Sequence, residues 1–66
     1  MMFVYGMRSR YFSIGTFPKK DFKELLDKKD LKEFTLNRDY YDFIGYNREL
    51  TKEEVYQYEL DFIGIK

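Results

Sequence analysis

The sequence contains no cysteine and no histidine, and these absences remove most familiar catalytic and metal chemistry. Without cysteine there is no disulfide and no thiolate metal site. Without histidine the chain lacks the commonest general base, and the usual nucleophilic triads need one of these two residue types. Neighbouring acids such as Glu53 and Glu54 do not face each other on a helix, and no glycine-rich phosphate loop is present. We therefore predict a protein that is not an enzyme and holds no metal or cofactor.

Long hydrophobic runs are also missing. No stretch approaches the length of a transmembrane helix, and the start, MMFVYGMRSR, lacks the basic region of a signal peptide. The sequence therefore predicts a cytoplasmic protein that does not contact a membrane.

The chain is instead rich in aromatic side chains. Its 66 residues include seven phenylalanines and seven tyrosines, 21% of the total. So short a chain forms one domain, residues 1–66, and its small core leaves many rings hard to bury. We therefore expect a homodimer or larger oligomer. The alternative is a monomer whose tyrosines lie flat on its surface.

The net charge is zero, but the charges are unevenly distributed. Residues 1–20 carry four basic and no acidic side chains, residues 21–36 four basic and five acidic, and residues 37–66 four basic and seven acidic. This asymmetry predicts either a positive patch that attracts an anionic ligand or two halves of one self-complementary surface.

Two stretches near the start favour β-strands. The first runs from about Phe3 to Arg8 with two-residue alternation, and the second from Tyr11 to Phe17, where Pro18 ends it. The alternative is one irregular extended arm over residues 2–17.

Two capping boxes predict helices. Asp21 and Glu24 predict a short helix from Phe22 to Lys28 or Lys29, with a further helical turn over residues 30–33. Thr51 and Glu54 predict a second helix.

That C-terminal helix is expected over residues 52–63. Leu50 and Val55 form its hydrophobic staple, and Gly64 is its left-handed C-cap. Before it, residues 40–46 read as a strand that is apolar on both faces.

The predicted fold class is therefore α+β, in the order β-β-short α-β-α. A small three-stranded antiparallel sheet carries the C-terminal helix on one face.

The best binding candidate is the arginine–tyrosine segment at the start, with the turn before the last helix. Arginine forks bind phosphate or carboxylate, and tyrosine rings stack on bases. The alternative is that Arg8 and Arg10 pair with Asp42 or with the acidic C-terminal helix. The predicted ligand- or partner-binding residues are Tyr5, Arg8, Arg10, Tyr11, Ser13, Tyr46 and Arg48.

Three segments follow a shared pattern: Tyr5–Pro18, residues 40–50 and Tyr58–Gly64. In them the sequence resembles a family of very small proteins from phages, prophages and mobile elements of Firmicutes. Residues 19–39 depart from the pattern and look like an insertion, and Asn47 stands where the family has aspartate.

The resemblance implies a counter-defence protein in the cytoplasm of a host bacterium. We expect a non-enzymatic oligomer that inhibits an anti-phage defence system by binding an immune protein or sequestering an anionic nucleotide signal. The alternatives are a single-stranded nucleic-acid-binding module and an assembly module whose partner is itself.

Overall fold

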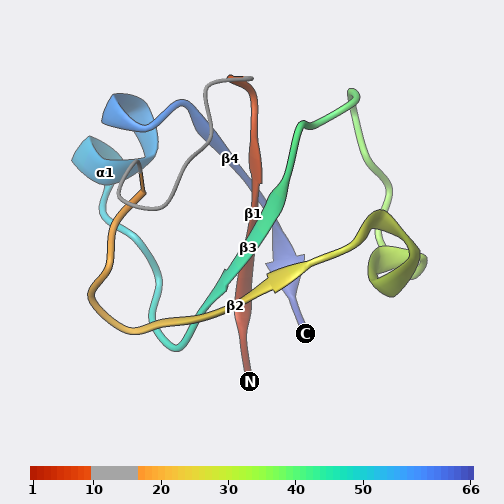
Figure 1. Cartoon of the computed structure of the whole chain (residues 1–66), viewed down its shortest axis with the longest axis horizontal. Helices are drawn as coiled ribbons and strands as arrows, with labels where there is room; N and C mark the ends of the chain where they lie inside the picture. The colour runs from red at the N-terminus through yellow and green to blue at the C-terminus, as the bar shows by residue number, and fades with distance from the viewer. Residues whose placement is uncertain (10–16) are drawn as a thin grey trace.

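A four-stranded antiparallel sheet forms the centre of the protein (Figure 1). The computed structural model describes residues 1–9 and 17–66. Within them the strand order is β2-β3-β1-β4, so β1 and β3 are central and β2 and β4 lie at the edges. The elements are β1 (Phe3–Met7), β2 (Phe22–Leu26), the 3-10 helix η1 (Lys28–Leu31), β3 (Phe43–Tyr46), α1 (Lys52–Gln57) and β4 (Leu60–Ile65).

The central strand β1 divides the protein into two cores. Its alternation places Tyr5 and Met7 on one face of the sheet and Val4 on the other. The core of the first face contains Tyr5, Met7, Phe17, Ile44, Tyr46, Leu50 and Leu60. The core of the second face contains Met2, Val4, Leu31 and Phe43.

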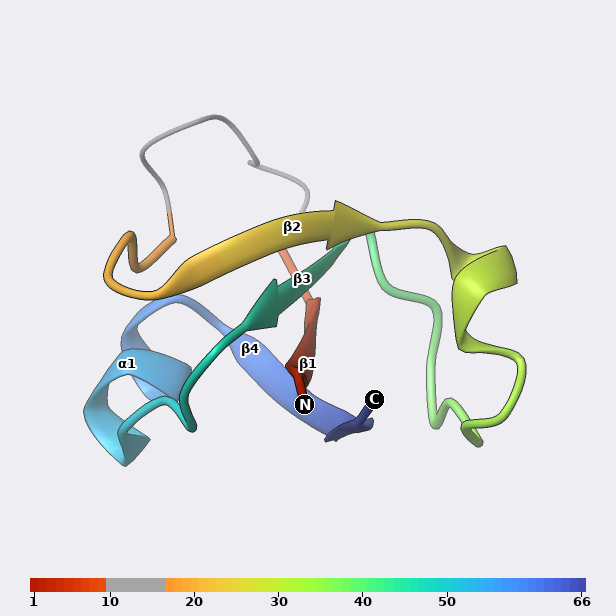
Figure 2. The same cartoon turned by 90° about the horizontal axis from the view of Figure 1, so that it is seen from below.

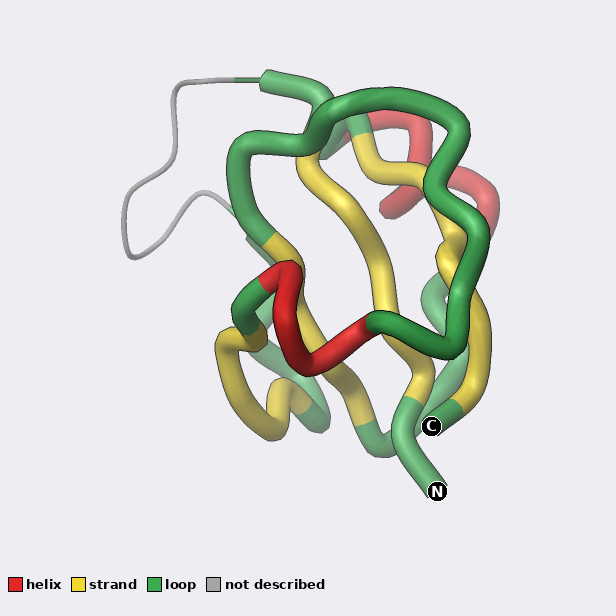
Figure 3. Tube along the Cα trace, turned by 90° about the vertical axis from the view of Figure 1, so that its right-hand side faces the viewer, coloured by secondary structure: helices red, strands yellow, loops and turns green. Residues whose placement is uncertain are grey.

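Different segments cover the two faces. Val55 and Tyr58, in α1 and the turn that follows it, pack against the core of the first face. The second face is covered by η1 and the chain after it, through Leu31, Phe34 and Leu36. Figures 1 and 2 show α1 and η1 at opposite ends of the sheet, and Figure 3 shows the segment after η1 running across the strands.

Glycines on the second face let this cover approach the strand backbone closely. The ring of Tyr40 lies over Gly6, and an added Cβ there would lie 2.6 Å from the ring. Phe34 covers Gly64, and Met2 covers Gly45, in the same manner. A side chain at any of these positions would push the cover away from the sheet.

The predicted helix after Asp21 is wrong, because this segment is β2. Asp21 has a φ of 61°, whereas a helix N-cap has an extended backbone. Phe22 instead packs against Phe17 and Tyr46, at ring separations of 4.9 and 5.9 Å. Pairing with β3 therefore overrides the local capping pattern.

The predicted helix over residues 52–63 is correct at its start and wrong at its end. The Thr51–Glu54 capping box is formed, but the helix ends at Gln57 and Glu59 turns the chain with a φ of 54°. The remainder is β4, paired with β1, and Gly64 is a strand residue rather than a C-cap. The sheet thus has four strands in place of the three predicted, with one short helix.

The other predictions of the fold have mixed outcomes. The first strand and the α+β class are confirmed, and β3 is shorter than its predicted range. The second predicted strand, Tyr11–Phe17, lies outside the described residues except for Phe17, which is buried outside any strand. Residues 19–39 are not a dispensable insertion, because they supply β2 and the cover of the second face.

Replacing Gly6 with alanine tests the glycine contacts. The new methyl group would clash with the Tyr40 ring, so we expect a loss of about 1–3 kcal/mol in the free energy of unfolding, measured by urea denaturation. In a Tyr40→Ala background the same replacement should cost much less. An equal cost in both backgrounds would show that Tyr40 does not impose the constraint.

Candidate binding surfaces

Tyr5 and Tyr46, two of the predicted binding residues, belong to the core. Their exposed fractions are 1% and 0%. The Tyr5 hydroxyl accepts a hydrogen bond from the Leu50 backbone N–H at 2.9 Å, and the Tyr46 hydroxyl donates to the Pro18 carbonyl at 2.7 Å. Burial raises the pKa of both tyrosines above its usual value. Both rings are therefore part of the core in this structure, and the binding role predicted for them stays a prediction.

Arg48 holds the turn before α1. Its two terminal nitrogens donate to the Glu54 carboxylate at 2.8 Å each, and its Nε donates to the Lys20 carbonyl at 3.2 Å. The Glu54 carboxylate also accepts the Thr51 backbone N–H at 2.9 Å. The hydrogen bonds from Arg48, and then that of the Thr51 backbone, lower the pKa of Glu54 to about 2. Arg48 therefore pairs with an acid of α1, and its predicted role in binding stays a prediction.

Arg8 lies at the end of β1 and contacts Asp61 of β4, with Nε 3.3 Å from the carboxylate. The same carboxylate accepts the Tyr40 hydroxyl at 2.7 Å and lies 3.7 Å from Nε of Arg38. Burial, and then the hydrogen bond to Asp61, raises the pKa of Tyr40. Arg8 therefore pairs with Asp61 and not with the predicted Asp42, but its side chain remains 35% exposed.

The other predicted residues of the basic segment, Arg10, Tyr11 and Ser13, lie outside the described residues. Their role in binding, and that of Arg8, stays a prediction.

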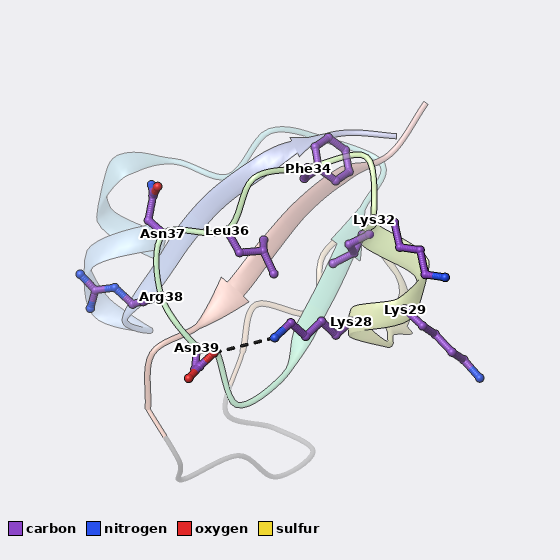
Figure 4. A pocket seen from close by; sticks show the side chains of 9 residues that line it. Lys28, Lys29, Lys32, Phe34, Leu36, Asn37, Arg38 and Asp39 are labelled. Carbon is purple, nitrogen blue, oxygen red and sulfur yellow. Dashed lines mark ion pairs between the residues drawn. The ribbon is translucent and has the colours of Figure 1, made fainter.

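A basic pocket that the sequence did not indicate lies over the second face (Figure 4). Its volume is about 720 Å³. Figure 4 shows Lys28, Lys29 and Lys32 on one side and Arg38 with Asn37 on the other. The residues that line it are Lys28, Lys29, Leu31, Lys32, Phe34, Leu36, Asn37, Arg38 and Asp39, four basic residues and one acidic.

Asp30 and Glu33, two acids close to the pocket in sequence, have partners that do not line it. The Asp30 carboxylate accepts the Asp27 backbone N–H at 3.1 Å, and Glu33 pairs with Lys66 at 3.1 Å. Of the lysines in the pocket, only Lys28 has an ion-pair partner among residues 1–9 and 17–66; this is Asp39, at 3.8 Å. The nearly balanced charges of residues 21–36 gave no indication of a basic pocket. The summed charge of a stretch of sequence does not show where each side chain points.

A second surface, which we call the β4 surface, consists of Tyr56, Phe62 and Ile65. Their exposed fractions are 85%, 52% and 48%, although all three are large and apolar or aromatic. Tyr56 and Phe62 border a hollow of about 410 Å³ that Arg8 and Asp61 also line. Because β4 is an edge strand, its outer backbone groups are open to a further strand.

Residues 1–9 and 17–66 contain no group of three acidic side chains placed to hold a metal ion. No helix in those ranges is long and apolar enough to cross a bilayer.

Comparison with known proteins gives a family. The model of the family described as "Defence against restriction A C-terminal" matches residues 1–63. The chain belongs to this family. The expected relation to phage and mobile-element counter-defence is thereby confirmed at the family level, whereas the Firmicutes origin stays a prediction. No curated protein and no solved structure matches the chain.

Arg8 and Arg48, two of the predicted binding residues, should differ in their effect on stability. Arg48→Ala removes a bidentate ion pair that is less exposed than that of Arg8. We expect the free energy of unfolding to fall by about 1 kcal/mol and the melting temperature by about 4–8 °C. Arg8→Ala removes a single, more exposed contact and should change the melting temperature little. A drop for Arg8→Ala as large as for Arg48→Ala would make Arg8 a structural residue.

The Arg48–Glu54 pair should also be visible in the pH dependence of stability. The pKa of Glu54 is lower in the folded chain, about 2 against an ordinary 4.5, so its contribution is complete above pH 4.5 and is lost as the pH falls toward 2. Urea unfolding of the natural chain and Glu54→Gln should therefore differ most near neutral pH and converge near pH 2. A difference independent of pH would exclude this ion pair as its source.

Proposed function

We propose that this protein acts in defence against restriction as a non-enzymatic binding protein that occupies a protein of the host restriction system. The family match over residues 1–63 is the observation that carries the proposal. Binding in a fixed ratio needs a contact surface and no catalytic group, and the β4 surface supplies such a contact.

The β4 surface has the properties of a protein contact. Tyr56 and Phe62 are aromatic residues of the kind enriched at interfaces, and they lie next to an edge strand. β4 carries one charged side chain, Asp61, and this carboxylate is held by Tyr40 and Arg8. The edge thus lacks the free charges that usually prevent strand addition.

A partner strand could pair with this edge by β-augmentation. Met2 and Lys66 exchange both backbone hydrogen bonds, at 2.8 Å each. In an antiparallel ladder the residue next to such a pair directs its backbone groups to the other side, so Ile65 offers its N–H and C=O outward. A second copy of the chain would use the same edge, which is the homo-oligomer that we propose as its resting state.

A second candidate function is binding of single-stranded nucleic acid or of a nucleotide. The four basic side chains of the pocket favour it. The stacking platform predicted at Tyr5 does not, because that ring is buried.

The proposal is tested by plating unmodified phage on a restricting bacterial strain that expresses the protein. We expect the efficiency of plating to rise above that on the same strain without the protein. Tyr56→Ser and Phe62→Glu should each remove the protection. Tyr56 is 85% exposed, so Tyr56→Ser should not affect folding.

Leu25→Glu is the matched control, because Leu25 is a half-exposed apolar residue on the opposite edge strand, β2. It should leave protection intact. If all three variants still protect the phage, the β4 surface is not the contact with the restriction protein. If the natural chain gives no protection, the proposed function itself is excluded.

A further inference from the structure

We infer that the basic pocket of residues 28–39 is a binding site for single-stranded nucleic acid, with phosphates on the lysines and a base against the apolar floor. The site lies on the second face of the sheet and does not include Tyr56 or Phe62 of the β4 surface. The inference deepens the second candidate function by giving it a site, and it does not depend on the binding of a restriction protein.

The first support is the uncompensated positive charge. Lys29 and Lys32 have no ion-pair partner in the described ranges, and the Lys28–Asp39 pair is long at 3.8 Å and exposed. Such a weak surface pair exchanges readily for phosphate contacts. Phosphate is the anion that places several negative charges along one flexible chain, matching lysines spread over one helical turn.

The second support is the floor of the pocket. Phe34 and Leu36 line it and are partly buried, so they offer apolar surface between the basic groups. Figure 4 shows both side chains between the lysines and Arg38. An unpaired base can rest on such a surface while its phosphates reach the lysines, whereas a base inside a duplex cannot.

The third support is the continuation of basic groups beyond the pocket. Arg38 lies 3.7 Å from Asp61, and Arg8 lies 3.3 Å from the same carboxylate. Two arginines around one acid leave a positive charge at this end of the pocket. A strand of several nucleotides can contact both the lysines and these arginines, and a free nucleotide cannot. This favours a strand over a small signal molecule.

The pocket is also held in place by the fold. Phe34 packs on Gly64, and Lys66 bonds to the Asp30 carbonyl and to Glu33. The first half of the segment is therefore fixed to β4 and its C-terminal continuation. A positioned set of cations binds with a smaller entropic cost than a mobile one.

The test is fluorescence anisotropy with a labelled single-stranded oligothymidylate. Three or four phosphate contacts to a single strand predict that affinity falls about 20- to 50-fold for a fourfold increase in salt concentration. Lys29→Gln with Lys32→Gln should weaken binding about tenfold or more and reduce the salt dependence. Lys23→Gln with Lys52→Gln removes the same charge from exposed positions outside the pocket and should change affinity less than twofold.

Three outcomes would overturn the inference. One is the absence of salt-dependent binding. Another is equal weakening by the two lysine pairs, because the charge would then act only at a distance. The third is equally tight binding of a duplex or of a free dinucleotide, since the site would then recognise phosphate alone or a small ligand. Protection against restriction is measured separately, so either proposal can fail without the other.

Discussion

Close packing of large side chains on strand glycines is the constraint on which the second layer of this protein depends. Gly6 and Gly64 let the rings of Tyr40 and Phe34 contact the strand backbone. The segment between these rings has little regular structure of its own, so these contacts and Leu31 hold it to the sheet. Residues 1–9 and 17–66 thereby cover both faces of a four-stranded sheet with one short α-helix among them.

The same constraint separates the charges of the segment. On η1 and the residues that follow it, Glu33 pairs with Lys66, and the Asp30 carboxylate closes the turn at Asp27. Figure 4 shows Lys29 and Lys32 extending outward, while Lys28 reaches toward Asp39. A surface with an excess of positive charge therefore arises from a stretch of the sequence that is almost neutral, without any specialised motif.

The sequence predicted what local interactions decide and missed what long-range pairing decides. The Thr51–Glu54 capping box is formed because its partners are three residues apart. The Asp21–Glu24 pattern is the same in kind, but pairing with β3 and the Phe22–Phe17 contact favour a strand. The β4 residues pair with β1, some 60 positions earlier, which no local period reveals. The pocket was missed because the summed charge of a stretch of sequence does not show where each side chain lies. The burial of Tyr5 and Tyr46 was missed because composition does not show which rings are covered.

Asp61 connects the two surfaces of the protein. Its carboxylate accepts the Tyr40 hydroxyl on the second face and lies between Arg38, which lines the basic pocket, and Arg8, which borders the β4 surface. The basic pocket and the β4 surface therefore share one carboxylate, even though they lie on different faces of the sheet.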